Sequence, residues 1–190
     1  RRCTLIVGGT EPEAAHVPAI LTGPEDARTL EAHVARANPI WRAIGDGARG
    51  LALFRGPQAY IRPGWYPSKR ETGKAVPTWA YVSVNLRGAL SVVTDPDWLV
   101  GHADRVSRAL EAGRPEPWSV AEAPEGYIAG MARGIVGLRM TVERMEGVWK
   151  LNQHRSAEDR AGGVAGLEAE GGPEGVEVAA LMRDRMDAEG

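Results

Sequence analysis

The sequence has almost no cysteine and no long apolar run. Cys3 is the only cysteine among 190 residues, so no disulfide can form within the chain, and a reducing, cytoplasmic location is expected. No run approaches the roughly 18 apolar residues from which a membrane-spanning helix is built, and no secretory leader is visible. We therefore expect no membrane partner.

A strong charge of either sign is also lacking. The chain carries 23 basic and 25 acidic side chains, a net charge of −2, which argues against a protein that coats nucleic acid. The helical stretch "GHADRVSRAL" offers only Arg105 and Arg108 as cations, whereas a DNA-reading helix clusters basic residues on one face. No P-loop, H-E-x-x-H or C-x-x-C motif is present. A nucleic-acid partner is therefore not expected.

The first half reads as short strands between turn residues. "CTLIV", "AAHVPAIL" and "GLALFRG" are compact apolar runs, and "AYVSVNLRGALSVV" alternates as a pair of barrel strands does. Pro39 predicts that a strand gives way to a short helix near Asn38. The sequence therefore predicts an α+β fold dominated by β, a barrel of about six strands with peripheral helices. Ligands of such small barrels bind at the mouth or across a dimer seam.

The second half begins with helices. Asp95 is placed as an N-cap, Pro96 as the first helical residue and Gly113 as a stop. "APEGYIAGMARGI" predicts a helix that begins at its proline, and "VGLRMTVERMEGVWKLNQ" returns to strand alternation. The chain then loosens into glycine and charge before a last amphipathic helix from about Pro173. We predict a cofactor-binding domain over 1–167 and a C-terminal tail with a helix over 168–190.

The segment from Gly56 to Trp79 concentrates prolines, aromatic rings and cations. We interpret it as a stiff loop that leans over a binding site, because a pre-organised wall binds a ligand at a lower entropy cost. Its cations suit anionic groups such as a phosphate or a propionate, and its rings can stack on a flat cofactor. The alternative is that the aromatics seal the barrel end and the lysines are solvated. The residues concerned are Trp65, Tyr66, Ser68, Lys69, Arg70, Thr72, Lys74, Thr78 and Trp79.

Several motifs resemble the PaiB family, whose members are described as FMN-binding negative transcriptional regulators. They are "HVARANPIWR", "GPQAYIRPGWYPSKRETGKAVPTWAY", "DPDWL", "EPW" and "IVGLRMTVERMEGVWKLNQHRSAEDRAGGVAGL", in the family's order. The resemblance covers about residues 3–167. It implies a split β-barrel of the flavin-reductase type, usually a homodimer with its cofactors at the interface. It also implies that an N-terminal element is missing before Arg1.

One branch of that family, the piperazate synthases, binds haem b instead of FMN. These enzymes close N5-hydroxy-L-ornithine into L-piperazic acid by forming an N–N bond. Their proximal haem ligand is a histidine, which the resemblance places at His33 in "HVARANP". Departures from the common PaiB pattern at Ala80, Asn85, Asn152 and His154 suggest a repurposed pocket and favour a specialised enzyme.

The candidate site residues follow from these motifs. His33 is the predicted ligand of haem iron, and its alternative is a half-buried histidine hydrogen-bonded in the barrel wall. His16 is a weaker candidate, His102 is expected at the surface, and His154 is expected near a pocket only in the less favoured interpretation. The cofactor-binding set comprises His33, Arg36, Asn38, Trp65, Ser68, Lys69, Thr78, Trp79 and Arg155.

We therefore predict a haem-dependent piperazate synthase-like enzyme of natural-product biosynthesis, a homodimer acting on a small amino-acid substrate. Lys69, Lys74 and Tyr66 are the candidates for the base that deprotonates the attacking amine. The alternative is an FMN-binding PaiB-type negative transcriptional regulator. A flavin-dependent oxidoreductase is a third possibility.

Overall fold

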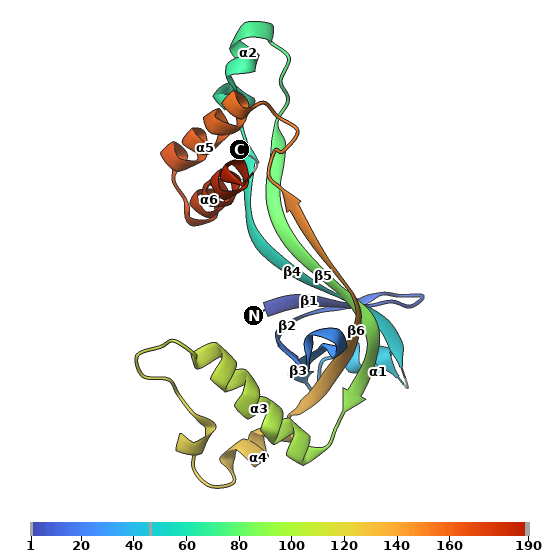
Figure 1. The fold of residues 1–190 in the computed structure, drawn as a ribbon. Coiled ribbons are helices and arrows are strands. Elements are labelled where there is room, and N and C mark those ends of the chain that lie inside the picture. The colour runs from blue at the N-terminus through green and yellow to red at the C-terminus, as the bar shows by residue number, and fades with distance from the viewer. Residues whose placement is uncertain (1, 46, 189–190) are drawn as a thin grey trace. The chain divides into compact units, whose positions relative to one another are not determined.

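A computed structural model describes residues 2–45 and 47–188 (Figure 1). The chain forms two compact units, which are described separately. The barrel unit comprises residues 1–54 and 85–146, and the helical unit comprises residues 55–84 and 147–190. Three long strands run from one unit into the other, so the division falls within them.

Six strands close an antiparallel barrel in the order β1-β2-β3-β6-β5-β4, which confirms the predicted fold class. Apolar residues point inward at alternate positions, as in β1, where Cys3, Leu5 and Val7 are buried. The close approach of strands requires Gly88, because a Cβ there would overlap the backbone oxygen of Thr141. The strands are β1 (Arg2–Val7), β2 (Glu13–Thr22), β3 (Thr29–Ala35), β4 (Ala48–Ile61), β5 (Thr78–Val93) and β6 (Ile135–Lys150).

Helices of the barrel unit follow the predicted start signals closely. The side chain of Asp95 accepts a hydrogen bond from the Trp98 backbone N–H and caps α3 (Pro96–Glu111). The short helix α1 (Ile40–Ile44) begins directly after Pro39, as predicted. The helix α4 (Tyr127–Ala132) begins after Gly126 rather than at the proline before it. Two 3-10 turns, η1 (Glu25–Ala27) and η3 (Val120–Glu122), complete this unit.

The helical unit departs from expectation in two segments. The expected loop after Gly56 contains the end of β4, η2 (Pro63–Trp65) and α2 (Pro67–Thr72). The stretch expected to loosen is instead the regular helix α5 (Ala157–Glu170), followed by α6 (Pro173–Asp187). Gly162 and Gly166 are contact positions of α5, since a Cβ at either would overlap Trp65. The expectation that this stretch loosens was wrong, because here the glycines allow close packing.

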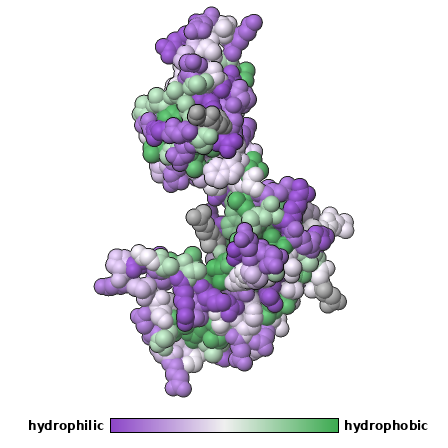
Figure 2. Space-filling view, in the orientation of Figure 1, coloured by the Kyte–Doolittle hydropathy of each residue, from purple (hydrophilic) through white to green (hydrophobic). Residues whose placement is uncertain are grey.

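The core of the helical unit joins α5 and α6 to the ends of the long strands. Tyr66 is fully buried and belongs to one apolar cluster with the strand residue Ile61 and the α6 residue Met182. Hydrophilic side chains cover much of the visible surface of each unit (Figure 2). The large apolar side chains left exposed include Val76, Trp79, Met131 and Trp149.

No helix among residues 2–45 and 47–188 combines the length and apolar character that crossing a membrane requires.

Candidate functional site

His33 lies on β3, where Glu31 is its neighbour on the same face. Period-two alternation sends Leu30, Ala32 and Val34 inward, so Glu31 and His33 face outward. The Nδ1 atom of His33 lies 3.0 Å from Nε2 of His102. Burial lowers the pKa of His33, so the ring is neutral near pH 7.

His102 is completely buried, and the expectation that it lies at the surface was wrong. It shares one face of α3 with Leu99 and Val106, the other buried residues of that helix. Their spacing of three and four residues was the sequence signal that marks His102 as facing the barrel. The indole of Trp98 stacks on the imidazole, with ring centroids 4.9 Å apart and an interplanar angle of 5°.

The carboxylate of Glu31 is the ionic end of this cluster. Its Oε2 atom lies 3.4 Å from His102 Nδ1 and accepts a hydrogen bond from Arg105 Nη2 at 2.8 Å. The Thr22 hydroxyl donates to the other oxygen at 3.2 Å. Burial alone would raise the pKa of Glu31, but the hydrogen bonds and charge of Arg105 hold it below its usual range. The pKa of His102 is lowered to about 4, chiefly by burial and then by His33. Neither Glu31 nor Arg105 is among the site residues predicted from the sequence.

The other polar residues of "HVARANP" hold the turn that follows β3. Arg36 donates to the backbone oxygens of Arg133 and Ile135 at 3.0 and 3.1 Å. Asn38 Oδ1 accepts a hydrogen bond from the backbone N–H of Ile40, at the start of α1. These contacts give both residues a structural task, and their roles as cofactor contacts stay predictions.

Tyr66 and Ser68 are engaged in the interior of the helical unit. The hydroxyl of Tyr66 accepts a hydrogen bond from Asn152 Nδ2 at 3.0 Å, and the Arg155 guanidinium lies 4.8 Å from the ring centroid. Burial raises the pKa of Tyr66. The backbone N–H and hydroxyl of Ser68 donate to the two oxygens of Asp159 at 3.0 and 2.6 Å.

The remaining candidates of the helical unit are more accessible. Lys69 and Lys74 are exposed, in α2 and in the turn after it. Trp79 donates from Nε1 to Gln58 Oε1 and packs against Tyr60. Half-buried Trp65 lies beneath the Arg62 guanidinium, and Thr78 begins β5. The predicted set thus divides between the two units, with His33, Arg36 and Asn38 in the barrel unit, and the assigned roles stay predictions.

Asp159→Ala is expected to destabilise the helical unit by about 1–3 kcal/mol, because the Ser68 N–H and hydroxyl lose the acceptor to which both donate. Chemical denaturation followed by circular dichroism measures the loss. Glu158→Ala is the matched control, since its exposed side chain precedes Asp159 in the same turn. Equal stability losses in the two variants would contradict this role of Asp159.

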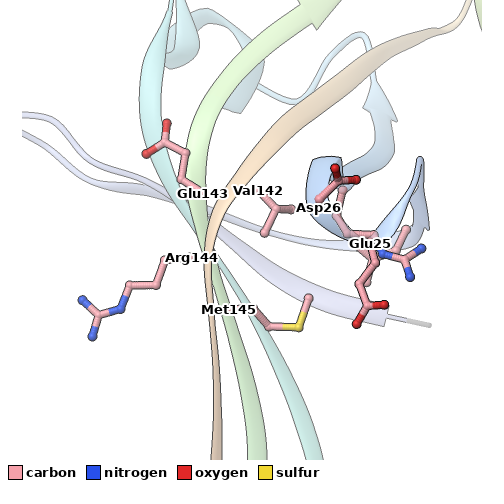
Figure 3. A pocket seen from close by; sticks show the side chains of 8 residues that line it. Glu25, Asp26, Val142, Glu143, Arg144 and Met145 are labelled. Carbon is pink, nitrogen blue, oxygen red and sulfur yellow. The ribbon is translucent and has the colours of Figure 1, made fainter.

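Two surface cavities contain none of the candidate residues. One, of about 600 Å³, is lined in the barrel unit by residues that include Glu25, Asp26, Val142 and Met145. Figure 3 shows Val142 and Met145 on the side of β6 that faces Glu25 and Asp26. The other, of about 550 Å³, lies in the helical unit beside Trp149. In the first cavity the two arginines, Arg28 and Arg144, are outnumbered by the acidic residues Glu25, Asp26 and Glu143, so the lining as a whole does not favour an anionic cofactor.

Within the described part of the chain, no three His, Cys, Asp or Glu side chains gather as ligands for a metal ion. His33 therefore offers a single nitrogen. In haem the macrocycle supplies four of the iron's ligands, so a single histidine nitrogen can be the protein's contribution to such a site.

Residues 3–144 match the family model described as "Putative FMN-binding domain". The chain belongs to this FMN-binding domain family. Protease synthase and sporulation protein PAI 2 of Bacillus subtilis is 30% identical over 176 residues, with 93% of this chain and 82% of that protein covered. An uncharacterised protein of Aspergillus fumigatus is also 30% identical, over 92% of this chain and 83% of its own length. These relatives place the chain in the PaiB-like group of the family.

Solved structures share the fold of this family. A FAD- and haem-binding protein from Mycobacterium smegmatis has a TM-score of 0.57 at 16% identity, covering 90% of this chain and 73% of that one. A flavocytochrome from Azotobacter vinelandii has a TM-score of 0.50 at 11% identity, over 84% and 67% of the two chains. At these identities the likeness concerns the split-barrel fold alone.

Proposed function

We propose that this protein binds FMN and acts as a regulatory protein of the PaiB type. The observation that carries the proposal is the match of residues 3–144 to an FMN-binding domain family, a stretch that includes most of the closed barrel. The similarity to PAI 2 over most of both chains supports the regulatory part, because that relative is named a protease synthase and sporulation protein.

The accessible groups of the helical unit suit the two parts of FMN. The exposed cations Lys69 and Lys74 would bind the phosphate, and the half-exposed indole of Trp79 offers a stacking face for the ring. Bound FMN would supply electron transfer in one-electron or two-electron steps. The protein's part is to bind and orient the group.

The first test is the absorption spectrum of protein produced with riboflavin and a haem precursor available. We expect the two-band spectrum of a flavin, and we expect Lys69→Ala and Lys74→Ala each to weaken FMN binding about tenfold, the effect of losing one charge-assisted hydrogen bond worth about 1.4 kcal/mol. Lys150→Ala removes the only other lysine and is the matched control. Failure to take up FMN in a direct titration would overturn the proposal.

A second candidate function is a haem-dependent cyclase like the piperazate synthases. One observation favours it: Nδ1 of His33 is already bonded to His102, which leaves Nε2 as the nitrogen available to iron. In that reaction the α-amine nitrogen of N5-hydroxy-L-ornithine bonds to N5 and the N–O bond breaks. The hydroxyl leaves with one amine proton as water, so no external reductant is consumed.

The same spectrum separates the two candidates. A Soret band that disappears in His33→Ala would replace the FMN proposal with the haem candidate. A flavin spectrum unchanged by His33→Ala would exclude the haem candidate. The homodimer and the amino-acid substrate stay predictions under either outcome.

A further inference from the structure

His33 is one end of a row of hydrogen-bonded polar side chains that come from β3 and α3. Glu31 and His33 are two residues apart on the outer face of β3. Trp98, His102 and Arg105 occupy positions i, i+4 and i+7 of α3, which is one face of a helix. The strand period and the helix period thus bring the two sets together within the barrel unit.

The donors and acceptors of this row can be assigned one after another, starting from the ion pair between Glu31 and Arg105. The ion pair with Arg105, at 2.8 Å, holds Glu31 as a carboxylate, a group that only accepts hydrogen bonds. His102 is fully buried, which favours the uncharged ring, and the Nδ1 atom that faces the carboxylate therefore carries its one N–H hydrogen. The Nε2 atom of His102 is then an acceptor. His33 Nδ1, which lies 3.0 Å from it, is therefore the donor and carries the hydrogen. The lone pair of His33 is left on Nε2.

Packing holds the middle of this row in place. The Trp98 indole stacks on His102, and the Arg105 guanidinium lies 5.6 Å from the Trp98 ring centroid. Gly137 pairs with His33 across the β3–β6 ladder, and a Cβ at this position would overlap the Trp98 ring. The glycine beside His33 therefore makes room for the indole that orients His102.

We propose that His102, Glu31 and Arg105 are positioning residues that fix His33 in the Nδ1–H tautomer, so that Nε2 is presented as a nitrogen ligand for haem iron. Metal-binding histidines in proteins generally donate their other ring N–H to an acceptor, which orients the ring and raises its basicity. This inference deepens the haem candidate. The tautomer is a property of the cofactor-free protein, so the two can fail separately.

The deciding experiment is a long-range 1H–15N correlation spectrum of haem-free protein labelled at histidine. His33→Gln identifies the His33 signals, and the His16 ring, bonded to Thr4 Oγ1 on another strand pair, is an internal reference. We expect the Nδ1–H tautomer for His33. The Nε2–H tautomer in the unmodified protein would overturn the proposal.

Two substitutions separate positioning from packing. His102→Phe keeps a ring against Trp98 but removes the acceptor, so we expect the His33 tautomer preference to be lost. His102→Gln supplies an amide oxygen as acceptor, and we expect it to restore the preference. Glu31→Gln replaces an obligate acceptor by an amide that also donates, and we expect a mixed population. An unchanged His33 tautomer in folded His102→Phe would overturn the proposal.

Haemin titration then tests the function that the tautomer serves. We expect His102→Phe to weaken haemin binding roughly 10–100-fold, the range found when the partner of a ligating histidine is removed, and His102→Gln to recover most of it. If the unmodified protein shows the Nδ1–H tautomer but binds no haemin, the haem candidate fails and the assignment of the positioning residues stands.

Discussion

The free energy of unfolding is expected to fall by about 2–3 kcal/mol as the pH is lowered from about 7 to about 4, owing to His102 alone. Its pKa in the folded protein is lowered to about 4, whereas an unfolded histidine titrates near 6.5. Between these values the unfolded chain binds a proton that the folded chain does not, so stability rises with pH across this window. Equilibrium denaturation at a series of pH values measures the slope.

His102→Phe is expected to flatten this slope, because the variant has no ring nitrogen to protonate at that position. His16→Phe removes an exposed histidine of the same unit and controls for the loss of one imidazole. Glu31 adds a loss of the same sign below its usual pKa range, because its folded pKa is lowered. An unmodified protein with equal stability at pH 7 and pH 5 would contradict the burial of a neutral His102.

The barrel could be predicted from the sequence because its signals are local. Alternating apolar residues predict strands, and the Asp95-Pro96 pair predicts the start of α3 to the residue. The closed order of the strands, with β3 beside β6, depends on pairing between distant segments. No local pattern in the sequence predicts that order.

The helix α5 could not be predicted, because its formation depends on packing against a distant residue and not on local signals. Isolated glycines lower helix propensity, so Gly162 and Gly166 favour a loop when the sequence is considered locally. In the fold both glycines admit Trp65 against α5, and burial of the neighbouring Val164 and Leu167 offsets the cost. Tertiary packing determines that this segment is helical, and no residue within 157–170 indicates that Trp65 is the packing partner.

The candidate site, too, could be predicted only in part. The resemblance pointed to His33, but the surroundings of His33 come from positions 31, 102 and 105, which lie on a strand and a helix far apart in the sequence. His102 was expected at the surface because one polar residue in a charged helix is usually solvated. Only the face it shares with Leu99 and Val106 reveals its burial. Its contact with His33, 69 residues away, is not encoded locally in the sequence.

Tyr66→Ala is expected to destabilise the helical unit by about 3–5 kcal/mol, the usual cost of removing a fully buried aromatic ring. The ring belongs to the apolar cluster that joins α5 and α6 to the long strands, and none of its surface is exposed. Denaturation of the variant, followed by circular dichroism, measures the loss. A stability change this large would reduce any activity without a chemical role for Tyr66.

Tyr66→Phe distinguishes the predicted base from a core residue. It keeps the ring and removes only the hydroxyl that accepts from Asn152 Nδ2, at a cost of about 1–3 kcal/mol for the unsatisfied buried donor. A core role predicts that folded Tyr66→Phe retains cofactor binding and turnover. Loss of turnover with cofactor binding and fold intact would instead support Tyr66 as the base. Because burial raises its pKa, the hydroxyl is protonated near pH 7 and would have to lose its proton before acting in that role, which favours the core role.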